Sequence, residues 1–224
     1  MDLWNAIQAR HSVRQYTDAP LTEEQIALLR QEIDRCNREG ALHIQLITNE
    51  PKAFAGPMAH YGSFRGVSNY FALVGKDQPG LEESCGYYGE RLVLLCQALG
   101  LNTCWVALTY KRIPGTIAER PGERLTAVIC VGVGRDPGVP HKSRSTEALS
   151  DYDGPRPDWF RRGMEAVLLA PTAVNQQRFH FSGKGNTVIA RTTPTLCGKM
   201  AKIDLGIAKY HFEIGAGTEN FLWG

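Results

Sequence analysis

A succession of helix, loop, strand, strand and helix occurs twice in this chain of 224 residues, and no other feature of the sequence restricts the fold as strongly. The capped helix and following strand at 22–43 have a counterpart of the same length at 158–179. Two later segments, 86–105 and 204–223, also match in length, and each ends on a tryptophan. A generic α+β arrangement would give a similar order, but we interpret the pattern as a diverged internal duplication. Two such copies are expected to pack about a pseudo-twofold axis, as the subunits of a symmetric dimer do.

Hydrophobic periodicity and capping signals place the individual elements. T-E-E-Q at 22–25 is a capping-box pattern that begins a helix with one apolar face, and Gly100 is a signal that ends another. The segment 134–157 is rich in Gly, Pro, Ser and charged residues, which predicts a long connection. Helices are expected at 1–10, 22–36, 81–99, 158–169 and 202–214, and strands at 42–48, 70–74, 103–108, 125–133, 178–181 and 187–192.

Charge and composition argue against several classes of function. With 25 basic and 23 acidic residues the net charge is only +2, so we expect no nucleic-acid partner. No apolar run approaches the length of a membrane span and no secretion signal is evident, which predicts a cytoplasmic protein with no membrane partner. The six cysteines form no C-x-x-C pair, and several lie in apolar runs. This pattern favours reduced core side chains and predicts no metal site.

The segment R-H-S-V-R at 10–14 has the composition of an anion-binding site. Arg10 and Arg14 offer rigid forks of N–H donors that match phosphate oxygens, and Ser12 adds a hydroxyl between them. Basic pentapeptides are also common on solvated surfaces, so the segment alone leaves both interpretations open.

Four motifs together resemble those of the FMN-dependent nitroreductase family. A-R-H-S-V-R-Q-Y at 9–16 is similar to the family's N-terminal motif, and L-G-L-N-T-C-W at 99–105 resembles its helix-to-strand turn. K-S-R at 142–144 is similar to its C-terminal K-x-R motif, and A-P-T-A-V-N-Q-Q at 170–177 looks like its A-P-S-x-x-N-x-Q-P-W loop. The resemblance covers most of the chain. It implies an α+β, nitroreductase-like fold with an antiparallel or mixed sheet flanked by helices.

The order of these motifs differs from that of the family. In the family the A-P-S loop follows the first capped helix, but here C-N-R-E-G at 36–40 takes that place and the intact loop lies in the second copy. The family's enzymes are homodimers that bind FMN across the interface, with basic residues from one subunit and the loop from the other. The resemblance therefore implies a single-chain, fused pseudo-dimer with one complete FMN site. Its first repeat, residues 1–150, would supply the N-terminal helix and basic motifs, and a shorter second repeat, 151–224, the loop.

The resemblance also implies which residues hold the phosphate end of FMN. Because a phosphate carries about two negative charges, it needs several convergent donors. Arg10, Arg14, Lys142 and Arg144 are the expected cations, with Ser12 contributing its hydroxyl. Lys142 and Arg144 have the alternative of a solvated charged loop.

The ring of the flavin is assigned to three other segments. Backbone groups of Val106, Ala107 and Leu108 would line one side of it, and Pro171, Thr172 and Ala173 would approach the other. The amide of Asn175 can both donate and accept, which suits the mixed edge of an isoalloxazine ring, although it has the alternative of capping the loop. Two further cofactor-binding candidates are Gln177, the last residue of the loop motif, and His11, which would bond the flavin or cap the helix end.

The activity implied is that of an NAD(P)H-dependent flavin oxidoreductase that reduces nitroaromatic, quinone or related small aromatic acceptors. No catalytic acid, base or nucleophile is predicted, because the flavin performs the hydride transfer and the protein positions it. Two alternatives stay open: a flavin-binding or sensory protein without turnover, and a family member that binds no flavin. The sequence chooses neither NADH nor NADPH, and neither monomer nor homodimer. Five aromatic residues would form a lid or pack elsewhere: Tyr61, Phe64, Tyr70, Tyr87 and Tyr88.

Overall fold

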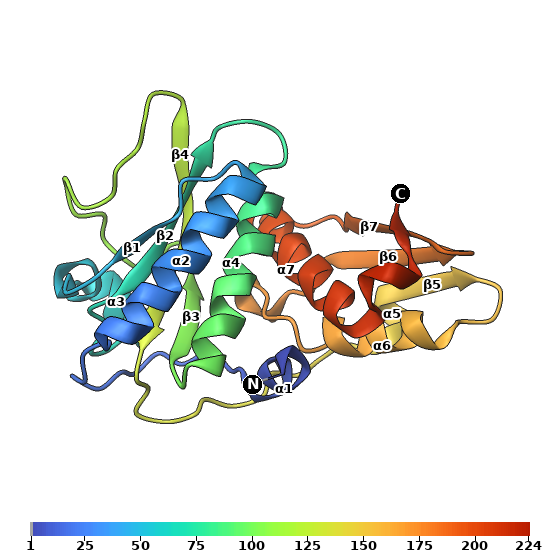
Figure 1. Cartoon of the computed structure of the whole chain (residues 1–224), viewed down its shortest axis with the longest axis horizontal. Coiled ribbons are helices and arrows are strands. Elements are labelled where there is room, and N and C mark those ends of the chain that lie inside the picture. Colours follow the sequence, from blue (N-terminus) through green and yellow to red (C-terminus); the bar gives the residue numbers. More distant parts are fainter. Residues whose placement is uncertain (1) are drawn as a thin grey trace.

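The computed structural model describes residues 2–224 and shows two four-stranded sheets with two long helices between them (Figure 1). Met1, the first residue of the predicted N-terminal helix, lies outside the described residues. The fold is α+β, with sheets flanked by helices, as expected from the sequence. No helix of residues 2–224 combines the length and the apolar character that a membrane crossing requires.

The first sheet is antiparallel throughout, with the strand order β1-β2-β4-β3. Leu73, in β2, and Ile129, in β4, face the helices and are fully buried. The opposite face is covered by the segment 50–68, which contains a 3-10 turn, η1 (Pro51–Phe54), and a short helix, α3 (Pro57–Tyr61). The strands are β1 (Gln45–Ile47), β2 (Tyr70–Lys76), β3 (Asn102–Val106) and β4 (Glu123–Gly132).

The second sheet is mixed, with the order β5-β6-β7-β8, and only its central β6–β7 pair is antiparallel. β6 (Phe179–Lys184) and β7 (Thr187–Thr192) confirm the predicted pair. The prediction of one long connection at 134–157 is wrong in part, because this segment contains α5 (Thr146–Leu149) and β5 (Ser150–Asp153). β8 (Leu222–Trp223) was not predicted either. Both additional strands are short and pair in parallel with distant partners, so no local periodicity marks them.

The helices follow their capping signals. α2 (Glu23–Gly40) begins at a complete capping box on Thr22 and extends four residues beyond the predicted end, to a left-handed residue at Ala41. α4 (Leu81–Ala98) is capped by Leu99, and the predicted glycine, Gly100, follows the cap with a left-handed φ of +74°. The other helical elements are α1 (Leu3–Ala9), α6 (Asp158–Val167), α7 (Gly198–Ala216) and the 3-10 turns η2 (Ala173–Asn175) and η3 (Thr218–Asn220).

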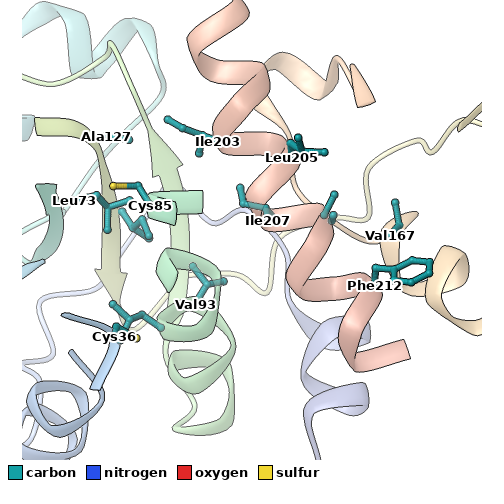
Figure 2. Close-up of a cluster of buried hydrophobic side chains, with 14 of the residues drawn as sticks. Cys36, Leu73, Cys85, Val93, Ala127, Val167, Ile203, Leu205, Ile207 and Phe212 are labelled. Atoms are coloured by element: carbon teal, nitrogen blue, oxygen red, sulfur yellow. The ribbon is translucent and has the colours of Figure 1, made fainter. Parts of the chain in front are cut away.

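α4 and α7 run side by side through the centre of the molecule and carry the largest part of the core (Figure 1). Figure 2 shows Ile203 and Ile207 extending from α7 toward α4 and the first sheet, whereas Phe212 lies beside Val167 on the side of the second sheet. α7 therefore joins the two halves of the chain through one continuous apolar interior. The N-terminal half of α7 also forms one wall of the cavity described next.

Candidate functional site

A cavity of about 350 Å³ opens where two parts of the chain meet: the first half, which forms the first sheet, and the second half, which forms the second sheet. The first half contributes the segment after α1 and the end of β3, and the second contributes the loop after α6 and the first turns of α7. The walls are mostly apolar, and three titratable side chains reach them. The lining residues are Ser12, Arg14, Gly62, Phe64, Cys104, Trp105, Val106, Ala107, Leu108, Thr109, Ala127, Pro171, Thr172, Ala173, Val174, Met200, Ile203, Asp204 and Ile207.

Eight of the fourteen predicted site residues line this cavity. They come from three segments that are far apart in the sequence, and the fold brings them together. Ser12 and Val13 are fixed to β3, since the N–H of Val13 donates to the carbonyl of Thr103 at 3.0 Å. This pairing places the side chain of Arg14 at the cavity and exposed to solvent. The eight residues are Ser12, Arg14, Val106, Ala107, Leu108, Pro171, Thr172 and Ala173.

The loop 172–177 has an unusual backbone. Val174, Asn175 and Gln177 all have positive φ angles, of 47°, 54° and 45°. Residues other than glycine adopt this left-handed backbone conformation at a cost of about 1–3 kcal/mol each. The surrounding contacts must therefore hold the loop in place. Val174 is β-branched and 89% exposed at the edge of the cavity. Strain of this kind concentrates at functional sites.

Asp204 anchors one side of the loop. Its carboxylate accepts a hydrogen bond from the backbone N–H of Ala173 at 2.9 Å and another from the side-chain amide of Gln176 at 2.8 Å. Asp204 lies in α7, is 2% exposed, and is the one carboxylate among the described residues that line the cavity. Burial raises its pKa to about 6, against the hydrogen bonds that favour the charged form. The sequence prediction missed Asp204; its signal was an acidic residue on the apolar face of a helix.

The other side of the loop holds the K-S-R segment. The side-chain amides of Asn175 and Gln177 both donate to the carbonyl of Lys142, at 2.8 and 2.9 Å, and the Gln177 carbonyl oxygen accepts from the N–H of Arg144 at 2.8 Å. Gln177 is 4% exposed, whereas the side chains of Lys142 and Arg144 are exposed. The two motifs are therefore one hydrogen-bonded unit. Lys142, Arg144, Asn175 and Gln177 are not among the residues that line the cavity.

Arg10 and His11 also lie outside the lining. The Arg10 side chain is 4% exposed and turns into the protein, where its guanidinium faces Glu90 at 3.9 Å and donates to the carbonyl of Leu169 at 3.4 Å. His11 is half-buried and its Cβ lies against Gly138. Of the two predicted arginines in the N-terminal motif, Arg14 thus reaches the cavity and Arg10 belongs to a buried cluster below it.

One of the five predicted aromatic residues reaches the cavity. Phe64 lines it and is 3% exposed, held by an edge-to-face contact with Phe54. Tyr61 is 85% exposed, and Tyr70 is buried in the same apolar cluster as Phe64 without reaching the cavity. Tyr87 and Tyr88 lie on α4 and pack against each other.

The lining of the cavity suits a largely apolar molecule with an anionic group. Apolar side chains form most of the wall, and Arg14 supplies a cation that takes part in none of the ion pairs found among residues 2–224. Lys142 and Arg144 are likewise free of ion pairs within this range. Cavities of this size and lining are the usual form of small-molecule and cofactor sites. Over residues 2–224, no group of three or more His, Cys, Asp or Glu side chains is arranged to hold a metal ion.

Comparison with known proteins agrees with this architecture. A family model described as "Putative TM nitroreductase" matches residues 2–216. The structure of a "putative nitroreductase" from Thermotoga maritima is 21% identical, with a TM-score of 0.64, over 96% of this chain and 83% of that one. A "putative nitroreductase in complex with FMN" from Desulfovibrio desulfuricans is 17% identical, with a TM-score of 0.52, over 69% of this chain and 98% of that one. A search of curated proteins found no significant match.

At these identities the two structures establish a shared fold, while the family model spans almost the whole chain. The cavity lies where motifs of the first and second halves of the chain meet, and both halves fall within the matched range. The chain therefore belongs to the nitroreductase family.

Proposed function

We propose that this protein is an FMN-dependent NAD(P)H oxidoreductase of the nitroreductase type. The observation that carries the proposal is the convergence of eight predicted cofactor residues, from three distant segments, on one cavity of about 350 Å³. The matched structure from Desulfovibrio desulfuricans is described as a complex with FMN, which supports the same cofactor here.

The residues present fit FMN. The apolar wall formed by Val106, Ala107 and Ile207 suits a flat aromatic ring, and the backbone groups of the loop at Thr172 and Ala173 can approach its polar edge. Arg14 and Ser12, two residues apart in the sequence, both line the cavity, and their guanidinium and hydroxyl groups can hold an anionic group. The exposed cations of the K-S-R segment, whose backbone is held by Gln177 and Asn175, would complete the donor set for the phosphate.

We further propose that the chain is a fused pseudo-dimer with one FMN site, formed by a first repeat at 1–150 and a second at 151–224. Two features support it: each half has its own sheet, and the cavity draws its lining cation, Arg14, from the first half and its loop from the second. The segment 36–40, which would have to form the loop of a second site, is the last part of a regular helix, and a left-handed cap follows it at Ala41. A stoichiometry of one FMN per chain is therefore expected.

Flavin in this site would exchange hydride with NAD(P)H and with a small aromatic or quinone-like acceptor. The residues of the chain bind, orient and shield. Phe64, Leu108 and Val174 lie at the wall and offer apolar surface to a planar acceptor. Arg14 would place a positive charge at the cavity wall, and such a charge would favour the electron-rich, reduced state of a bound flavin. Asp204 holds the loop and touches no predicted donor for the phosphate.

The test is an absorbance titration of the purified protein with FMN, followed by NADH or NADPH without oxygen. We expect flavin bands at about one FMN per chain, and bleaching of these bands by the nicotinamide. Steady-state oxidation of the nicotinamide should then require a nitroaromatic or quinone acceptor. Bands that never bleach would indicate a binding or sensory protein, and a protein that binds no flavin would overturn the proposal. A stoichiometry near two would overturn the single-site assignment alone.

A further inference from the structure

A buried group of charged residues lies directly beneath the cavity. It consists of Arg10, Glu90 of α4 and His211 of α7, and we call it the Arg10–Glu90–His211 cluster. Glu90 and His211 are fully buried, and Arg10 is 4% exposed. The cluster meets the cavity through Trp105, a lining residue whose indole N–H donates to the Glu90 carboxylate at 2.9 Å. Ile207, one helical turn before His211, lines the cavity as well.

The contacts of His211 fix the number of protons in this cluster. Nδ1 of His211 lies 3.0 Å from the carbonyl oxygen of Ala166, and Nε2 lies 3.0 Å from a carboxylate oxygen of Glu90. A carbonyl only accepts, so Nδ1 must carry a hydrogen. A hydrogen must also lie between Nε2 and Glu90, because two lone pairs cannot face each other at this distance in a buried site.

The total charge follows from this count. A neutral imidazole carries one N–H hydrogen, so beside an ionised carboxylate it could donate to the Ala166 carbonyl or to Glu90 but not to both. The two contacts therefore require one more proton on the His211–Glu90 pair. The extra proton gives either imidazolium with carboxylate or imidazole with carboxylic acid. Both states make the pair neutral, and Arg10 adds one positive charge.

Other titratable groups near the cluster leave that sum unchanged. His141 faces it from the segment after β4, Cys104 from β3 and Tyr210 from α7. Burial lowers the pKa of His141 and raises the pKa values of the Cys104 thiol and the Tyr210 hydroxyl. All three are therefore neutral near pH 7.

We propose that Glu90 and His211 share a proton so that the Arg10–Glu90–His211 cluster keeps a net charge of +1 beneath the cavity, and that this charge favours the reduced over the oxidised form of the bound flavin. This inference rests on the proposed function. A charge in the protein interior is only weakly screened, and a reduced flavin carries more negative charge than an oxidised one. Neither Glu90 nor His211 lines the cavity, so both act on the cofactor through the field they set up and are not catalytic residues.

Two variants, the isosteric E90Q and the amide replacement H211Q, separate this proposal from a purely structural role. H211Q leaves Arg10 and an ionised Glu90, so the cluster loses its net charge. E90Q leaves Arg10 and an imidazole that accepts from the new amide, so the net charge stays at +1. H43Q is a matched control, because His43 forms a comparable pair with Glu123 at 2.8 Å and neither residue lines the cavity.

The first readout is the ratio of the affinities for reduced and oxidised FMN, obtained from the midpoint potential of the bound flavin. We expect H211Q to lower this ratio by roughly tenfold, the size of one charge acting over several ångströms in a protein. E90Q and H43Q should change it by less than about twofold. Equal shifts in H211Q and E90Q, or no shift in H211Q, would overturn the proposal.

The second readout needs no flavin. In the protein without FMN at pH 7, ¹⁵N spectra of the His211 ring and ¹³C spectra of the Glu90 carboxyl should show a doubly protonated ring or a protonated acid. A neutral ring beside an ionised carboxylate would overturn the shared proton. If wild-type protein binds no FMN, the proposed function fails while this measurement still decides the charge of the cluster. Should H211Q fail to fold by circular dichroism, H211N carries the same test.

Discussion

Gly86 of α4 and Gly206 of α7 occupy reciprocal positions where the two central helices cross. A Cβ at Gly86 would lie 2.0 Å from the carbonyl oxygen of Ile203, and a Cβ at Gly206 would lie 2.0 Å from the carbonyl oxygen of Glu83. Each glycine thus packs against the main chain three residues before the other. The same contact, between a glycine and the carbonyl group three residues before the other glycine, thus occurs once in each direction. Such a reciprocal pair is what a twofold axis between two equivalent helices produces.

G86A and G206A should each destabilise the protein by about 2 kcal/mol or more. The added methyl group meets backbone atoms, which cannot move without separating the helices, and this outweighs the gain of about 1 kcal/mol from better helix propensity. Urea unfolding followed by circular dichroism measures the change. G198A is the matched control, since Gly198 begins the same helix α7 and a Cβ at this position would have no neighbouring atom within 4 Å. A G206A protein as stable as G198A would contradict the packing argument.

The burial of Asp204 should appear as a pH dependence of stability. Because its folded pKa is raised to about 6, the folded state binds a proton that the unfolded chain has already released above its ordinary value near 3.9. This group therefore makes the free energy of unfolding fall as pH rises from about 4 to 6. D204N should gain ~2–3 kcal/mol relative to wild type between pH 4 and pH 7.5. Denaturant titrations at each pH measure the difference, and D34N on the exposed face of α2 should show no such trend.

Removal of the Asp204 side chain should also loosen the loop that it anchors. D204L deprives the N–H of Ala173 and the amide of Gln176 of their acceptor. Because the loop contains three left-handed residues, we expect it to relax and the affinity for FMN to fall by about tenfold or more. D204N/Q176E exchanges donor and acceptor and should restore most of that affinity. Hydrogen exchange at Ala173 follows the loop directly, and unchanged protection in D204L would refute its anchoring.

R14A should weaken FMN binding and slow its reduction. Arg14 is the one arginine among the described residues that line the cavity, and hydrogen bonds to a charged group contribute about 1.5–3 kcal/mol, or at least tenfold in affinity. Fluorescence titration and anaerobic stopped-flow absorbance measure the two effects. R30A, an exposed arginine of α2, serves as the control. If R14A kept both the affinity and the rate of wild type, the assigned role of Arg14 would be wrong.

Q177L should affect FMN more than riboflavin. The buried amide of Gln177 fixes the backbone of Lys142 and Arg144, which are proposed to meet the phosphate. Its loss should lower the affinity for FMN by about tenfold and the affinity for riboflavin, which has no phosphate, by less than about threefold. K142A/R144A should show the same selectivity without loss of the loop. An equal loss for both ligands would place the K-S-R segment away from the phosphate.

The sequence determined most of the elements and the chemistry of the individual motifs. Helical periodicity and caps are local properties, so α2, α4 and β7 lie where the pattern predicts them, with the predicted Gly100 just after the cap of α4. The basic pentapeptide and the A-P-T loop are likewise contiguous, and their donors could be named before the fold was known.

Only the tertiary structure decided which of these residues face one cavity. Arg10 and Arg14 look equivalent in the sequence, yet one turns into a buried cluster with Glu90 and the other reaches the cavity wall. Asp204 gains its role from a loop 31 positions away, and Gln177 from a segment 33 positions away. Such contacts depend on how α4 and α7 cross and on where the loop is held, because hydrogen-bond partners distant in the chain meet only after the core has packed.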